Sequence, residues 1–160
     1  MTSQEQLNAA REQLRLVLDF FGRVETKLSV VLGVDLAMLG FLASKIPATA
    51  TVSTAGWIAA GLFALLNGGS LWNLYRASAP QLEGGHDSLV YFREIAKRTE
   101  VGFVDEYRRL TEDPLGKDVL GQVWRNSQIL KIKFDCLALA YRFMAASIVA
   151  WVVALVIVTP

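Results

Sequence analysis

Apolar residues near the start of the chain recur at alternating intervals of three and four positions. Within residues 3–26 they are Leu7, Ala10, Leu14, Val17, Phe21 and Val24, and the series continues with Leu28 and Val31. This spacing puts them on one face of a helix and is typical of helices that pack along a seam. The pattern predicts one long helix from about Gln4 to Ile46. Its seam needs a partner helix, from this chain or from another copy.

Two further amphipathic segments follow later in the chain. Asp113 and Pro114 predict a helix start, because Asp caps helix N-termini and proline is favoured in the first turn. We expect this helix to continue without a breaker to about Val158, with a seam formed by Val119, Val123, Leu130, Phe134, Leu137, Tyr141, Met144 and Ile148. A middle helix ending near Leu110 is predicted from Leu89, Phe92, Ile95, Ala96, Phe103 and Tyr107.

Three long segments of the chain are almost free of charge. Asp35 is the only ionisable residue between Lys27 and Lys45, and none lies between Lys45 and Arg76 or after Arg142. A hydrocarbon core of about 30 Å is crossed by roughly 20 helical residues, so each segment is long enough to span a bilayer. The composition, 53% hydrophobic and 19% charged, agrees with this interpretation. These features argue against a water-soluble monomer.

The distribution of positive charge predicts the orientation of the spans. Of the 16 Lys and Arg residues, all but Lys45 lie before the first uncharged segment or between the second and the third. The positive-inside rule places both of these regions in the cytoplasm, with residues 46–54 as an outer turn. We therefore expect an all-α membrane protein with three transmembrane helices and a cytoplasmic helical bundle, formed by extensions of the first and last spans plus the middle helix. The expected parts of this single domain are an arm (1–27), the first span (28–46), the second span (55–75), a cytoplasmic segment (76–137) and the third span (138–158).

Small residues recur at every fourth position of the second span, at Gly56, Ala60, Ala64 and Gly68. Such a stripe lets two helices approach closely in lipid. It predicts a helix-packing face, although chance in a helix rich in alanine and glycine would give the same pattern.

Asp35 is the most informative polar residue of the spans. A carboxyl group inside a membrane helix normally faces a partner or a water-filled cavity. At about 1.5 Å per residue, Asp35 lies about 12 Å beyond Lys27, and Asn67 lies about as far from Arg76 on the returning helix. We therefore expect an Asp35–Asn67 contact, with Arg142, at the border of the third span, as the alternative partner. The contact is either structural or part of a pore or switch.

The residues that could carry enzyme chemistry are sparse. The sequence has no glycine-rich phosphate loop, no nucleophile elbow and no usable Cys/His pairing. His86 is expected to be an exposed loop residue, and the single cysteine, Cys136, is expected to pack in an apolar environment. We therefore expect no catalysis, no metal and no cofactor.

Three stretches of the chain resemble, in order and at similar spacing, the Pycsar transmembrane effector family. VETKLSVVLGVDLAMLGFL is similar to the family's first span, in which an acidic and then a basic residue precede an apolar helix with a polar residue about two turns in. Family members commonly carry Lys-Ala-Ser and an Asn there, so Asp35 departs from the pattern. SLVYFREIA resembles a Tyr-Phe element, and GQVWRNSQILKIKFDCLALAYRF resembles the final element, where a Lys and an aromatic residue precede the last span.

The resemblance implies a bacterial antiphage effector of the inner membrane. In such systems a partner cyclase senses infection and makes a cyclic pyrimidine mononucleotide, and the effector then impairs the membrane and halts the cell. We therefore expect a homo-oligomer that binds cCMP or cUMP, with no nucleic-acid partner. Candidate phosphate ligands are Arg93, Lys97 and Arg125, and candidate base-stacking rings are Tyr91 and Trp124; each basic residue could instead belong to a solvated, mixed-charge helix face.

Two other functions remain open from the sequence. One is a non-signalling membrane scaffold or accessory subunit that holds a soluble partner with its N-terminal arm. The other is a small ion channel in which Asp35 binds a cation.

Overall fold

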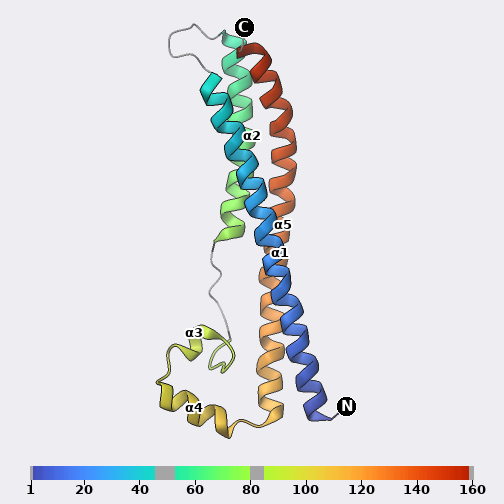
Figure 1. Cartoon of the computed structure of the whole chain (residues 1–160), viewed down its shortest axis with the longest axis vertical. Coiled ribbons are helices and arrows are strands. Elements are labelled where there is room, and N and C mark those ends of the chain that lie inside the picture. The colour runs from blue at the N-terminus through green and yellow to red at the C-terminus, as the bar shows by residue number, and fades with distance from the viewer. Residues whose placement is uncertain (1, 46–52, 80–84, 159–160) are drawn as a thin grey trace. The chain divides into compact units, whose positions relative to one another are not determined.

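The computed structural model describes residues 2–45, 53–79 and 85–158, and within these ranges every regular element is a helix. The elements are α1 (Ser3–Lys45), α2 (Thr54–Ser78), α3 (Phe92–Ile95), α4 (Glu100–Arg109) and α5 (Glu112–Val158) (Figure 1). Three of them, α1, α2 and α5, are long and apolar enough to cross a membrane. The predicted all-α membrane fold with three candidate spans is thereby confirmed. Most of the predicted outer turn, residues 46–52, lies outside the described residues.

The chain divides into two compact units that share its two longest helices. The head unit comprises residues 1–23 and 80–131, and the spanning unit comprises residues 24–79 and 132–160. Helices α1 and α5 therefore each contribute residues to both units. The uncharged segments of the sequence fall in the spanning unit, and most of the charged residues fall in the head unit.

The predicted seam of α1 is confirmed and continues beyond Val31. Its members are buried or partly buried, and the same spacing adds the buried residues Asp35, Met38 and Leu42. In the head unit, Leu7 and Ala10 pack with Val119 of α5. In the spanning unit, the three long helices share an apolar cluster made of Met38, Leu42, Ala59, Phe63, Ala150 and Ala154.

The seam predicted for α5 is confirmed except at Tyr141 and Ile148, since its other members are buried or partly buried. Val119 and Leu137 are buried as expected, but Tyr141 and Ile148 are each 39% exposed. The buried positions of α5 keep the spacing of three and four, shifted by one residue, and include Gln122, Cys136, Ala140, Ser147, Ala150 and Ala154. Lipid is as apolar as a leucine side chain, so helices in a membrane pack through small and polar residues and turn large apolar ones outward. In the last part of α5, the buried positions therefore carry smaller residues than the predicted seam, including Ala140, Ser147, Ala150 and Ala154.

The predicted middle helix is divided into α3 and α4. The Thr99 hydroxyl accepts a hydrogen bond of 3.2 Å from the N–H of Gly102 and so caps a new helix. The guanidinium of Arg98 fixes the preceding turn, because it donates to the carbonyls of Asp87, Ser88 and Glu94 at 3.0–3.1 Å and to the Glu106 carboxylate at 2.9 Å. These local bonds compete with helix continuation.

Candidate functional site

A buried polar cluster joins the three helices of the spanning unit. Asp35 of α1 and Asn67 and Ser70 of α2 are each at most 1% exposed. The Asn67 amide donates to Oδ1 of Asp35 at 3.3 Å, and the Ser70 hydroxyl lies 2.5 Å from Oδ2 of Asp35. The same hydroxyl lies 3.2 Å from the carbonyl oxygen of Ala140 on α5. The expected Asp35–Asn67 contact is confirmed.

The cluster fixes how the helices are aligned. Asp35 occupies a seam position of α1, where a single polar residue specifies the register of packed helices. Hydrogen bonds between side chains of membrane helices contribute roughly 0.6–2 kcal/mol each. Within one chain the cluster is therefore a packing contact, and a role for Asp35 or Asn67 in a pore stays a prediction. Ser70 was not predicted, although its place one turn after Asn67 puts both on one face of α2.

A second polar contact joins the same three helices near the Lys27 end of the spanning unit. The Lys133 ammonium lies 2.6 Å from Oε1 of Glu25 and 2.7 Å from the carbonyl oxygen of Ala77. Ala77 belongs to the last turn of α2, whose carbonyls lack partners within the helix and attract a cation. The Lys133 side chain is only 12% exposed. The acidic residue of the first motif and the lysine of the final motif thus meet, a pairing that the sequence alone did not reveal.

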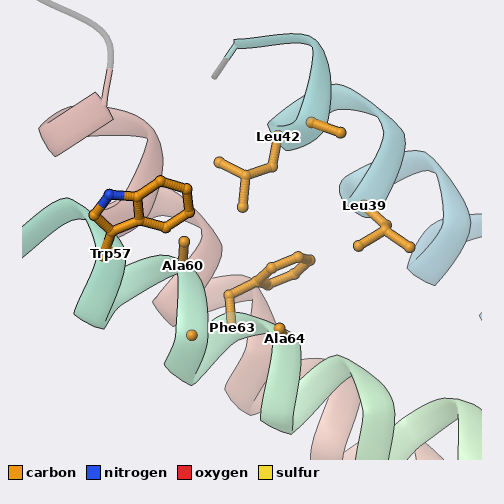
Figure 2. A pocket seen from close by; sticks show the side chains of 8 residues that line it. Leu39, Leu42, Trp57, Ala60, Phe63 and Ala64 are labelled. Atoms are coloured by element: carbon orange, nitrogen blue, oxygen red, sulfur yellow. The ribbon is translucent and has the colours of Figure 1, made fainter. Parts of the chain in front are cut away.

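The small-residue stripe of α2 lies mostly outside the packing of a single chain. Gly56 is buried and Ala60 partly buried, whereas Ala64 and Gly68 are exposed. Ala60 and Ala64 help to line an apolar groove of about 300 Å³ between α1 and α2 (Figure 2). The face of α2 that packs within the chain runs instead through Ala59, Phe63, Asn67, Ser70, Leu74 and Ala77. Packing between copies through the stripe stays a prediction.

Close packing of α2 requires a different glycine, Gly69. A methyl group built at Gly69 would lie 2.7 Å from Cδ1 of Phe143, whereas one built at Gly68 meets nothing within 4 Å. The aromatic ring of Phe143 on α5 therefore occupies the space that Gly69 leaves.

The five candidate nucleotide ligands all lie in the head unit. Tyr91 is the N-cap residue of α3, and Arg93 and Lys97 lie in or just after that helix, while Trp124 and Arg125 lie on α5. Two hydrogen bonds attach the segment before α3 to α5. The N–H of Leu89 donates to Asp118 at 2.8 Å, and Gln122 donates to the Ser88 hydroxyl at 3.4 Å.

The candidates differ in the exposure of their side chains. Trp124 is 63% exposed and Arg93 is exposed, whereas Tyr91 and Arg125 are partly buried. The Lys97 ammonium lies 2.5 Å from Oε1 of Glu94, and this hydrogen bond holds the pKa of Glu94 below its ordinary value. A phosphate would have to compete with Glu94 for Lys97. Among the described residues, no group of three or more His, Cys, Asp or Glu side chains is placed to hold a metal ion.

Comparison with known proteins identifies the family. A sequence profile described as the Pycsar effector protein domain matches residues 9–159. No curated protein and no solved structure gives a significant match. The matched region contains nearly all of the three candidate spans and the whole segment between the second and third of them. This chain therefore belongs to the family of Pycsar antiphage effectors.

Proposed function

We propose that this effector responds to a cyclic pyrimidine mononucleotide, cCMP or cUMP, by impairing the bacterial inner membrane and so arresting growth. The observation that carries the proposal is the sharing of α1 and α5 between a charged head unit and an apolar spanning unit. Ligand binding in the head unit acts on two helices that also form the spanning unit. The active form is a homo-oligomer, and its N-terminus is cytoplasmic, as the concentration of Lys and Arg in residues 1–27 and 76–137 favours.

The ligand site is proposed to involve α3 and the neighbouring part of α5. Arg93 and Arg125 would meet the phosphate, because charge-assisted hydrogen bonds from guanidinium groups suit phosphate oxygens. Tyr91 and Trp124 offer aromatic faces on which a pyrimidine stacks. Lys97 would join them after it leaves Glu94. To move the effector from about 1% to 99% active, the ligand must prefer the active state by roughly 5.5 kcal/mol.

Liposome leakage tests this function. The purified full chain is reconstituted into liposomes of bacterial lipids that hold a self-quenched dye, and cCMP, cUMP or cAMP is added. We expect leakage with one pyrimidine nucleotide and none with cAMP. No leakage with either pyrimidine nucleotide would favour a scaffold, and leakage that ignores nucleotides would favour a constitutive channel.

A variant pair tests the location of the ligand site. Arg93→Gln combined with Arg125→Gln should abolish both the leakage and nucleotide binding measured by calorimetry. Arg11→Gln combined with Arg15→Gln removes the same charge from exposed positions of α1 and should change neither. Equal effects of the two pairs would contradict the proposed location.

A further inference from the structure

Arg142 lies far inside the third candidate span, on the exposed face of α5. Its side chain is exposed, and it forms no hydrogen bond or ion pair with any described residue. Arg142 follows Ala140 by two residues. The carbonyl oxygen of Ala140 is within hydrogen-bond distance of the Ser70 hydroxyl, and the same hydroxyl contacts Asp35. Arg142 is therefore within about one helical turn of the level of Asp35. The sequence had placed it at the border of the span.

The level of Asp35 is near the middle of the apolar layer. Asp35 follows Lys27 by eight residues and precedes Lys45 by ten, which corresponds to about 12 Å and about 15 Å along α1. A charged side chain at such a depth almost always faces a bundle interior or a water-filled cavity rather than lipid. Arg142 does not face the interior of its own bundle, so it requires an aqueous or charged neighbour outside it.

No span of a second copy offers a free carboxylate to Arg142. Asp35 is the only acidic residue between Lys27 and Arg76, and no acid follows Arg142. Asp35 is itself fully buried and hydrogen-bonded to Asn67 and Ser70. The spans therefore offer the arginine charge no free carboxylate, and water with a mobile anion can balance it instead.

The surroundings of Arg142 on α5 suit close approach by other copies. Ala138, Ala145 and Ala146 lie one turn before and after it on the same face, and all three are exposed. Small side chains at such positions let helices of neighbouring copies approach closely. Further toward the end of α5, the face continues with Val149, Val153 and Val156, each at least 47% exposed.

We propose that Arg142 residues from several copies line a water-filled path that conducts small anions such as chloride. The proposal rests on the proposed function, because it specifies how the membrane is impaired. A ring of arginines favours anions, and an apolar constriction closes a path by excluding water. The valine face supplies that constriction in the resting oligomer. Arg142 thus sets which ions pass, and the valines set whether they pass.

Ion selectivity tests the role of Arg142. The full chain is placed in planar bilayers with unequal KCl concentrations and activated by cCMP or cUMP, and the reversal potential gives the chloride-to-potassium permeability ratio. We expect chloride to dominate in the parent protein and in Arg142→Lys, the ratio to fall toward unity in Arg142→Gln, and potassium to dominate in Arg142→Glu. Arg76→Gln, which removes an exposed charge at the end of α2, is the control and should leave the ratio unchanged. An unaltered permeability ratio in Arg142→Gln would overturn the proposal. It would show that the Arg142 side chain only extends along the helix to the membrane surface.

A labelling experiment tests the same surface without any nucleotide, so it separates this proposal from the proposed function. Arg142→Cys is made in a Cys136→Ala background, and Leu65→Cys, on the 76% exposed lipid-facing side of α2, serves as the control. We expect Arg142→Cys in liposomes to react with a membrane-impermeant anionic thiol reagent and to form disulfide-linked dimers on oxidation, and Leu65→Cys to do neither. If Arg142→Cys behaves like Leu65→Cys, position 142 faces lipid and the proposal fails, whatever the nucleotide response. If the labelling succeeds but nucleotides cause no current, the proposed activation is wrong and the arginine-lined path stands.

Discussion

The neighbouring glycines Gly68 and Gly69 provide a matched test of how α2 packs against α5. A methyl group at Gly69 would lie 2.7–2.8 Å from two ring carbons of Phe143, while the same group at Gly68 meets open space. Overfilling a packed site costs about 1–3 kcal/mol. Replacing a helix glycine by alanine also stabilises the helix by about 1 kcal/mol, and this gain applies equally to both positions. We therefore expect Gly69→Ala to be about 1–3 kcal/mol less stable than Gly68→Ala.

Reversible unfolding in mixed detergent micelles, followed by tryptophan fluorescence, measures this difference. The double variant Gly69→Ala, Phe143→Leu should recover part of the loss, since the smaller side chain vacates the space in which the two groups collide. Equal stabilities of Gly68→Ala and Gly69→Ala would refute the close contact between α2 and Phe143. Gly68→Ala also tests the small-residue stripe. If this variant cross-links less between copies than the parent protein does, at unchanged stability, the copies pack through the stripe.

Three further changes test the polar contacts. Lys133→Met removes two hydrogen bonds that the charged ammonium donates and should lower the stability by about 1–3 kcal/mol in the same unfolding assay. Lys27→Met, at an exposed position with no hydrogen bond or ion pair to the described residues, should change the stability by less than about 0.5 kcal/mol. Equal losses would argue against the Lys133 contact. Asp35→Asn keeps a side-chain acceptor for Asn67 and should retain most of the stability. Asp35→Leu should lose about 1–3 kcal/mol, because buried Asn67 and Ser70 lose the side-chain oxygens that accept their shortest hydrogen bonds. The hydrogen bond from Lys97 is the main cause of the lowered pKa of Glu94. It should stabilise the head unit above the ordinary pKa of a glutamate, and this contribution should disappear as the pH falls through the lowered value. Proteolysis of the head unit at decreasing pH should show this dependence in the parent protein and a weaker one in Lys97→Met, which keeps the hydrogen bond from the Asp87 N–H to Glu94.

The sequence predicted the helices and one seam well, because charge gaps and periodicity report directly on membrane spans and on helix faces. The α1 seam was predictable because its buried positions from Leu7 to Leu42 are large and apolar, with Ala10 and Asp35 as the exceptions. The Asp35–Asn67 contact followed from depth alone, since helical rise is constant. These predictions needed no knowledge of which helices are neighbours.

The remaining features depend on which helix faces meet, and this is not encoded in hydrophobicity once lipid is the solvent. The face of α5 that packs inward carries Ala140 and Ser147, while Ile148 turns outward. The ion pair of Lys133 with Glu25 links residues 108 positions apart, so no local pattern could reveal it. The depth of Arg142 became apparent only when Ala140 was found beside Ser70.

The Ser70 hydroxyl carries one hydrogen and has two oxygen atoms within reach, one on α1 and one on α5. It can satisfy only one of them at any instant. Rotation about a single side-chain bond of Ser70 therefore moves the hydrogen bond of α2 from α1 to α5, while Ser70 stays buried. The buried polar cluster thus offers α2 two alternative attachments, a shorter one to α1 and a longer one to α5.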